Sequence, residues 1–254
     1  IPFYFSIYNL TFLNALFEAV SGFTSTGFTI FENIKHIDQG LIIWRSSIQW
    51  IGGLYFLFSI IFLIDIYDES LKKSLTNFLS FNTTEVLKQT IKIFILYSSL
   101  TLAIFIILNL FGIRSFNSLN LAMTIISSGG FLPVETLDNI VRNNLQSFFL
   151  CIGFLVSLLN FYLVYNFFLD RNNIKQHRED IYLIFLVLGF SFIFFLVNDI
   201  EVLSTFISVL SSIGNSGISS SEVPENFGLY FLILTLIGGS ILSTTSGLKF
   251  LRIY

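Results

Sequence analysis

The stretch "VSGFTSTGFTIF" (residues 20–31) places hydroxyl side chains and a glycine inside an otherwise apolar sequence. Of the 254 residues, 54% are hydrophobic, 17% are aromatic and only 11% are charged, which is too apolar for a water-soluble domain of this size. The composition therefore predicts a membrane protein. Within a bilayer, a polar stretch such as residues 24–27 must be covered by protein or line a water-filled cavity, because lipid offers no hydrogen-bond partner.

Four segments are long enough to cross a bilayer as helices, since a hydrocarbon core of about 30 Å needs about 20 residues. They cover residues 41–64, 93–112, 145–169 and 181–197. A fifth apolar segment, 227–247, becomes rich in glycine, serine and threonine towards its end. The first residues, "IPFYFSIYNL", resemble the tail of a further spanning helix and no methionine begins the chain, so we expect a fragment of a longer protein.

Three apolar segments are too short to cross. Residues 14–23, 117–126 and 202–212 number 10 or 11 each, and as helices they would reach about 15 Å, half of a bilayer. Each precedes a polar cluster: "TSTGF" (24–28), "SSGGF" (127–131) and "GNSGI" (214–218). This recurrence predicts an internal repeat of span, half-helix, hydroxyl and glycine strand, and span, in which Gly27, Gly129 and Gly217 align.

The charges predict the orientation of these clusters. The connections on the side away from the clusters carry nine basic residues: Lys72, Lys73, Lys88, Lys92, Arg171, Lys175, Arg178, Lys249 and Arg252. The cluster side carries four, Lys35, Arg45, Arg114 and Arg142, so the positive-inside rule places the clusters outside. The acidic residues on the outer side would concentrate cations there, or are ordinary solvated loop charge. A net charge of −3 without a basic stripe excludes nucleic acid as a partner.

The clusters have the chemistry of a weakly held monovalent cation. Glycine permits backbone dihedrals that point successive carbonyl groups the same way, and such carbonyls can replace the hydration shell of an ion. The partial negative charge at each half-helix C-terminus would add to this attraction. No carboxylate lies inside a cluster, as a Ca²⁺ site would require. His36 and His177 lie far apart and Cys151 is the single cysteine, so no zinc-type site is expected.

"NALFEAVSGFTSTGFTIF" (14–31) followed by "GLIIWRSSIQWIGGL" (40–54) resembles the first pore-loop repeat of the Trk/Ktr/HKT superfamily of potassium uptake proteins, and is most similar to its Trk-type membrane subunits. The pattern WRSxxQWxGG at residues 44–53 is the most specific part. "NLAMTIISSGGF" (120–131) resembles the second repeat, and "SVLSSIGNSGI" (208–218) with "IGGSILSTTSGLKFLR" (237–252) resembles the third.

The resemblance implies an all-α membrane protein whose repeated units stand pseudo-fourfold around a central pore, with the fourth unit absent from this chain. It divides the sequence into repeat one with a truncated first span (1–64), a cytoplasmic connection (65–86), repeat two (87–169), a second cytoplasmic connection (170–180) and repeat three with a gating loop (181–254). It also implies a bacterial cytoplasmic (inner) membrane location, K⁺ as the transported ion without a further cofactor, a homodimer in lipid, and a cytosolic nucleotide-binding regulatory subunit.

Residue by residue, the resemblance assigns two sites. The expected potassium filter consists of Thr24, Ser25, Thr26, Gly27, Ser127, Ser128, Gly129, Asn215, Ser216 and Gly217. The expected gate in repeat three consists of Gly238, Gly239, Ser243, Thr244, Thr245, Ser246 and Gly247. Leu242 and Ser246 stand where Trk sequences usually have glycine, and a plain helix end with hydroxyls bonded back to carbonyls is the alternative for this segment.

Two other functions compete with potassium uptake. A sodium-conducting relative is the first; in the plant HKT branch a serine in place of the first filter glycine goes with sodium, so Gly27 favours potassium. An intramembrane lipid-modifying enzyme is the second, and it would need converging acid, base or nucleophile groups. Asp199 and Glu201 are the nearest acidic pair and have no histidine partner in the sequence around them, so we expect no enzyme.

Three charged residues near the clusters have open roles. Glu18 and Arg45 would be costly within a membrane unless paired or exposed to water. We expect them to pair and brace the first cluster, with Arg45 reaching to the interface as the alternative. We interpret Lys249 either as an anchor at the inner interface or as a gating charge.

Overall fold

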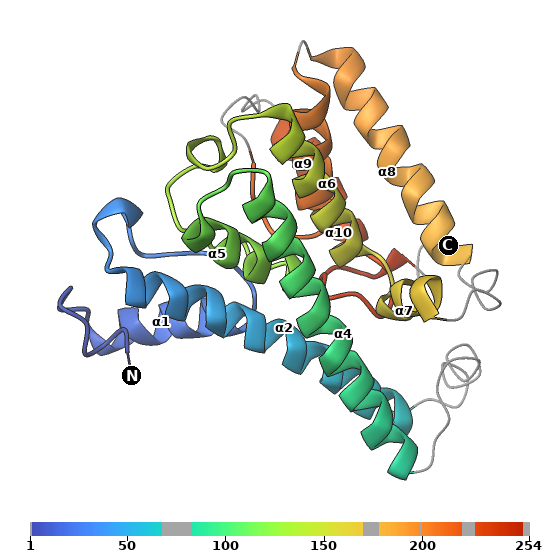
Figure 1. The fold of residues 1–254 in the computed structure, drawn as a ribbon, viewed down its shortest axis with the longest axis horizontal. Coiled ribbons are helices and arrows are strands. Elements are labelled where there is room, and N and C mark those ends of the chain that lie inside the picture. Colours follow the sequence, from blue (N-terminus) through green and yellow to red (C-terminus); the bar gives the residue numbers. More distant parts are fainter. Residues whose placement is uncertain (1, 68–82, 170–177, 199, 220–226, 251–254) are drawn as a thin grey trace.

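The computed structural model describes residues 2–67, 83–169, 178–198, 200–219 and 227–250, and the regular structure in them is entirely helical (Figure 1). The α-helices are α1 (Phe12–Phe23), α2 (Gln39–Tyr67), α4 (Thr83–Leu110), α5 (Ser115–Ile126), α6 (Asn144–Leu158), α7 (Phe161–Leu169), α8 (Arg178–Val197), α9 (Val202–Ile213) and α10 (Gly228–Ile237). Two short 3₁₀ turns, Ile34–His36 and Leu137–Asn139, lie in the connections.

The three predicted half-helices are present as α1, α5 and α9, each 12 residues long. The predicted spans 41–64 and 93–112 lie within or largely within α2 and α4, and 181–197 lies in α8. By length and composition, residues Leu87–Leu110 of α4 and Arg178–Val197 of α8 could each cross a membrane.

The predicted span 145–169 is wrong as a single helix. The chain breaks between α6 and α7, because Leu159 adopts an extended conformation (φ −76°, ψ 159°). Residues 2–8 form turns, so the expected helical tail at the start is also wrong. Most of the predicted connections 65–86 and 170–180 lies outside the described residues, and the helices α2, α4 and α8 extend into their ends.

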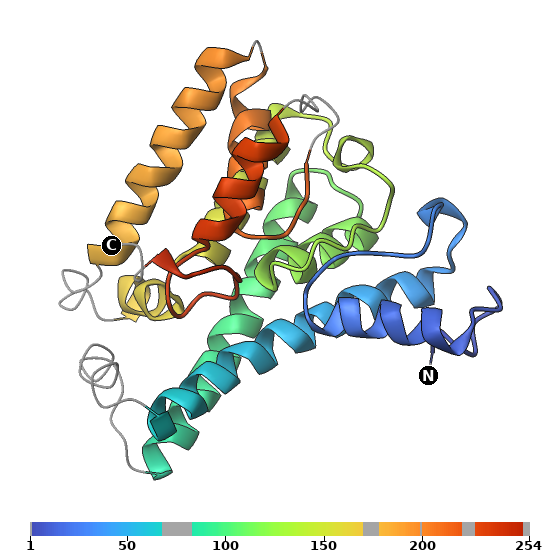
Figure 2. The same ribbon diagram turned by 180° about the vertical axis from the view of Figure 1, so that it is seen from behind.

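Helices α5 and α9 lie in the interior of the fold. Helix α5 packs against α2, α4 and α6, and α9 packs against α6, α8 and α10 (Figures 1 and 2). Their inward residues, including Leu121, Ile125 and Leu210, belong to one apolar cluster with α4 and α6. Helix α1, in contrast, packs on α2 and exposes six apolar side chains: Phe12, Leu13, Leu16, Phe17, Val20 and Phe23.

Candidate ion-conduction site

Each half-helix ends in the same hydrogen-bonded cap. In α1, Ser25 N donates to Gly22 O (3.0 Å) and Thr26 N donates to Ser21 O (2.9 Å), the two bonds of a Schellman motif. The same bonds close α5 (Ser128 N to Ile125 O, Gly129 N to Thr124 O) and α9 (Asn215 N to Ser212 O, Ser216 N to Ser211 O). The hydroxyl and glycine clusters are therefore three copies of one backbone turn.

The turn places a non-glycine residue in the left-handed region at equivalent positions. Ser25, Ser128 and Asn215 have φ values of 53°, 54° and 58°. Asparagine tolerates this conformation, whereas it costs serine of the order of 1–2 kcal/mol. Strained backbone of this kind concentrates at functional sites, so it marks the three turns as candidates.

The cap bonds correct the alignment of the second cluster. Gly129 is the counterpart of Thr26, and Gly130 is the counterpart of Gly27. The φ values of Gly130 and Gly27 are 84° and 82°. Gly217 (φ 64°) occupies the same position in the third copy. All three glycines are the fourth residue of their clusters TSTGF, SSGGF and GNSGI.

The three polar segments, defined as residues 24–28, 127–131 and 214–218, lie next to one another in sequence order. A Cβ atom on Gly27 would come within 2.7 Å of Gly129 O and 3.4 Å of Gly130 Cα. A Cβ atom on Gly130 would overlap Ser216 O, while one on Gly217 meets no described atom within 4 Å. The first segment therefore contacts the second, the second contacts the third, and no described residue covers the far side of Gly217.

Two cavities lie at opposite ends of these segments. One, here called the glycine cavity, has a volume of about 280 Å³ and is lined by all three left-handed glycines, Gly27, Gly130 and Gly217, with Arg45 and Glu135 beside them. The other, here called the hydroxyl cavity, also has a volume of about 280 Å³ and is lined by Ser25 and Ser128 among others. The first two segments thus separate two cavities that could hold water and ions.

Most backbone carbonyl groups of the polar segments are available to a ligand. Among the described residues, no hydrogen bond is donated to the carbonyl oxygens of Ser25, Thr26, Gly27, Ser128, Gly130, Asn215, Ser216 and Gly217. Six of these residues are buried or half-buried, where a carbonyl group without a donor is uncommon, while Thr26 and Gly217 are exposed. A dehydrated cation is a chemically suitable partner for them.

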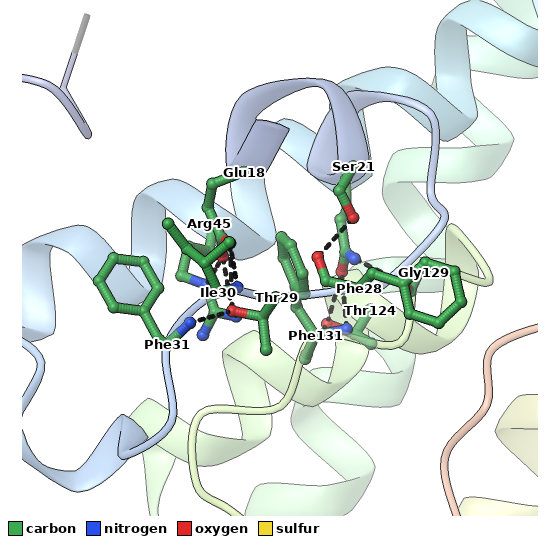
Figure 3. Close-up of polar contacts among 11 residues, drawn as sticks. Glu18, Ser21, Phe28, Thr29, Ile30, Phe31, Arg45, Thr124, Gly129 and Phe131 are labelled. Carbon is green, nitrogen blue, oxygen red and sulfur yellow. Dashed lines mark hydrogen bonds and ion pairs between the residues drawn. The ribbon is translucent and has the colours of Figure 1, made fainter. Parts of the chain in front are cut away.

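A buried ion pair holds the first segment. Arg45 Nε donates to Glu18 Oε1 at 2.9 Å, and both side chains are almost fully buried (Figure 3). Thr29 Oγ1 donates to Glu18 Oε1 at 2.9 Å and accepts from Arg45 Nη2 at 2.9 Å, and Ile30 N donates to Glu18 Oε2 at 3.1 Å. The expected pairing is confirmed, and Arg45 is buried at 1% exposure instead of extending to an interface; its network binds Thr29 and Ile30, directly after the first segment.

A neutral amide holds the second segment. Gln49 Nε2 donates to Gly129 O at 2.5 Å, and Gln49 Oε1 accepts from Phe131 N at 3.2 Å. Thr124 Oγ1 donates to Phe131 O at 2.7 Å, just as Ser21 Oγ donates to Phe28 O at 2.6 Å in the first copy (Figure 3). No role was predicted for Gln49, although it belongs to the WRSxxQWxGG pattern.

The rest of that pattern fits the half-helix ends against α2. A Cβ atom on Gly52 would overlap Phe23 O at the end of α1, and one on Gly53 would lie 2.9 Å from Ser127 Cβ at the end of α5. Trp50 Nε1 donates to Thr101 Oγ1 of α4 at 2.9 Å. One face of α2 therefore carries Arg45 and Gln49 as braces. Gly52 and Gly53 let the caps of α1 and α5 approach α2 closely.

After α10 the chain folds into a closed loop, residues 238–250, beside α7 (Figure 2). Gly238 (φ 70°) and Gly247 (φ 91°) meet at its neck, where a Cβ atom on Gly247 would lie 2.9 Å from Gly238 Cα. Gly239 N donates to Thr245 Oγ1 at 2.9 Å inside the loop. The predicted gate segment is thus a folded loop and not a plain helix end.

The break between α6 and α7 is a docking point for this loop. Ser240 N donates to Leu158 O and Phe161 N donates to Leu242 O, each at 3.0 Å. The buried Asp180 of α8 joins them, because its Oδ1 accepts from Asn160 N at 2.9 Å and from the Ser240 hydroxyl. These tertiary hydrogen bonds replace those that a continuous helix would have made.

The loop also touches the polar segments. Ser128 Oγ and Thr244 Oγ1 lie 3.3 Å apart, and Thr244 and Ser246 line the hydroxyl cavity. Asn215 Nδ2 donates to Thr235 O, near the end of α10, at 3.0 Å. Residues predicted for the filter and for the gate, 116 positions apart in one case, therefore meet in space.

Comparisons with known proteins agree with this geometry. No family model matches the sequence. The chain is 28% identical over 266 residues to the Trk system potassium uptake protein TrkG of Escherichia coli, covering 96% of this chain and 54% of that protein. It is 24% identical over 267 residues to an uncharacterized cation transporter of Methanocaldococcus jannaschii, covering 99% and 54% respectively.

The fold is that of a solved transporter. The crystal structure of the potassium transporter TrkH from Vibrio parahaemolyticus matches with a TM-score of 0.84 at 19% identity, over 96% of this chain and 54% of that one. This chain therefore spans about half the length of the relatives it matches.

Fold and sequence similarity together indicate a multi-pass membrane protein. More particularly, the chain is similar over nearly its whole length to Trk potassium uptake proteins, as its motifs predicted.

Proposed function

We propose that this chain forms part of a potassium uptake protein, in which the three polar segments are three strands of one selectivity filter. The observation that carries the proposal is their convergence: three identical caps bring three left-handed glycines to one cavity, with carbonyl groups that accept no hydrogen bond from the described residues. Carbonyl oxygens at close quarters can replace the hydration shell of K⁺. The names of the bacterial relatives, which are potassium uptake proteins, support the same ion.

The filter strands would stand pseudo-fourfold, with a fourth repeat completing the ring. Two observations support this arrangement: no described residue covers the far side of Gly217, and α1 exposes a row of large apolar side chains that includes Phe12, Leu16 and Phe23. These are the two ends of the series of three segments. A fourth unit between them would fill the far side of Gly217 and cover α1.

The loop 238–247 would act as the gate. It supplies Thr244 and Ser246 to the hydroxyl cavity, directly beneath Ser128, where a loop of this kind can obstruct an ion leaving the filter. The positive-inside rule places the glycine cavity outside and the loop on the cytoplasmic side of a bacterial inner membrane. A homodimer and a cytosolic nucleotide-binding regulatory subunit complete the proposal, and both rest on the resemblance to the Trk family.

A sodium-conducting relative is the second candidate. The observation that favours this candidate is the hydroxyl-rich first segment, in which Thr24, Ser25 and Thr26 precede the first glycine. Against it, all three filter positions that the backbone makes equivalent are glycine: Gly27, Gly130 and Gly217. Ion selectivity separates the two candidates.

The test is potassium-limited growth of an uptake-deficient bacterium that carries the protein as its native gene encodes it, with Rb⁺ and Na⁺ flux measured. We expect growth rescue with Rb⁺ favoured over Na⁺, and loss of that preference in Gly27→Ser and Gly130→Ser. Gly189→Ala is the matched control, since a Cβ atom there meets no described atom within 4 Å. Unaltered selectivity in the Gly→Ser variants at Gly27, Gly130 and Gly217 would refute the filter.

A further inference from the structure

Lys249 lies just after the neck of the loop 238–247, in an unusual conformation. Its φ is 63°, in the left-handed region that a long side chain rarely adopts. An interfacial anchor needs no such conformation, because a lysine can extend to the headgroups from ordinary helical or extended backbone. The strain therefore indicates that the surrounding contacts fix this residue in place.

The side chain turns back into the loop and makes three contacts there. Lys249 Nζ donates to Ser243 O at 3.0 Å, to Ser243 Oγ at 3.2 Å and to Thr245 O at 2.5 Å. On its other side, Nζ lies 5.4 Å from the centroid of the Phe56 ring, within range of a cation–π interaction. The amine thus contacts the loop and α2, and these contacts do not fit the interpretation of Lys249 as an anchor at the inner interface.

These contacts lie on both sides of Thr244, the loop residue that contacts the second polar segment. Ser243 and Thr245 flank Thr244, whose hydroxyl lies 3.3 Å from Ser128 Oγ. Phe56 and Thr244 both line the hydroxyl cavity. An amine that binds both neighbours of Thr244 fixes the direction in which Thr244 points.

We propose that Lys249 is a positioning residue that ties the loop shut: its amine joins Ser243 to Thr245 and so holds Thr244 beneath Ser128, at the inner end of the filter. This inference rests on the proposed function, because it assigns a role within the gate. Release of the amine frees both carbonyl groups and lets the loop leave the hydroxyl cavity.

The charges around the amine give the tie a pH dependence. Burial lowers the pKa of Lys249 from 10.5 to about 7, and Glu179 on the first turn of α8 acts in the opposite direction. Asp180 is the other described acid beside the loop, bound to Ser240, while α2 presents the uncharged Phe56 to the amine and the second polar segment presents the uncharged Ser128 to Thr244. A released, hydrated Lys249 would regain its ordinary pKa.

The sign follows from proton linkage. Between pH 7 and about 10 the amine is neutral in the tied state, where its two hydrogens still serve Ser243 O and Thr245 O, and protonated in the released state, so raising the pH in this window stabilises the tied state. Below pH 7 both states carry the proton and the dependence ends. Flux through the native protein should therefore fall as the pH on the loop side rises from 7 to 9.

The experiment measures Rb⁺ flux into proteoliposomes that contain the protein as its native gene encodes it, at loop-side pH 7, 8 and 9. We expect Lys249→Met to raise flux about tenfold at pH 9, from the loss of the amine's hydrogen bonds, with unchanged selectivity for Rb⁺ over Na⁺ and a flat pH profile. Lys88→Met, which removes an exposed charge in α4, should leave flux and its pH profile as in the native protein.

The outcomes separate the two proposals. A native protein without selective Rb⁺ flux would contradict the proposed function. Selective native flux with no pH dependence between 7 and 9, or a folded Lys249→Met protein whose flux does not rise, would overturn the tie alone. Because the native pH profile needs no variant, the tie stays testable if Lys249→Met fails to fold.

Discussion

The first and second polar segments share one backbone turn but are held in different ways. The first follows α1, which exposes most of its apolar side chains, and it is braced by the buried ion pair of Glu18 and Arg45. The second follows α5, which is largely buried, and it is braced by the uncharged Gln49. Where packing is sparse, a directional charged network fixes the segment; where packing is dense, one amide suffices.

Both braces come from a single face of α2. Arg45 and Gln49 are four residues apart, so they project from the same side of the helix one turn from each other. A movement of α2 would therefore shift both segments together.

The largest expected effect comes from breaking the charged brace. Arg45→Met leaves the Glu18 carboxylate buried without its partner, which should cost about 3–5 kcal/mol of stability. Thermal unfolding of the purified protein in detergent would measure the loss. The double variant Glu18→Gln with Arg45→Met should recover more than half of it, and a double variant as unstable as the single one would contradict the brace.

An intermediate effect is expected at the neutral brace. Gln49→Leu keeps the volume of the side chain but leaves Gly129 O and Phe131 N without their partner, at a cost of about 1–3 kcal/mol. The same unfolding assay should therefore rank Gln49→Leu between the native protein and Arg45→Met. A loss as large as that of Arg45→Met would show that the two segments do not differ in the way described.

The smallest expected effect is a difference in Rb⁺ flux between variants of Ser25 and Ser128, the two serines with a left-handed backbone. Ser128 Oγ lies against Thr244 of the loop, whereas the Ser25 hydroxyl makes no hydrogen bond with any described residue. We expect Ser128→Ala to increase Rb⁺ flux at most a few-fold, through loss of one weak contact, and Ser25→Ala to leave flux nearly unchanged. Equal changes in the two variants would remove the proposed link between the second segment and the loop.

Helix placement could be predicted from the sequence because apolar length and polar interruption are local signals. The half-helices α1, α5 and α9 and the pairing of Glu18 with Arg45 were predicted correctly. The break before Phe161 was missed because its one local signal, Asn160, lies in a long apolar run; Asn160 Oδ1 accepts from Tyr162 N at the start of α7. Two residues distant in sequence complete the break: Ser240 N donates to Leu158 O, and Asp180 Oδ1 accepts from Asn160 N.

Two details of the site were missed in the sequence. The clusters TSTGF, SSGGF and GNSGI already place Gly130 fourth, as Gly27 and Gly217 are, and the positive φ values of these three glycines confirm that alignment over the one with Gly129. The role of Gln49 depends on a contact with Gly129, 80 residues away. Its position one turn after Arg45, in a motif already singled out, was the signal that could have found it.

An ion bound between the polar segments can be located in crystals of the native protein grown in Rb⁺. We expect an anomalous Rb⁺ peak enclosed by the carbonyl oxygens around Gly27, Gly130 and Gly217, and its loss when Na⁺ replaces Rb⁺. A well-ordered filter region without a peak there, or a peak that Na⁺ does not remove, would contradict the proposed filter.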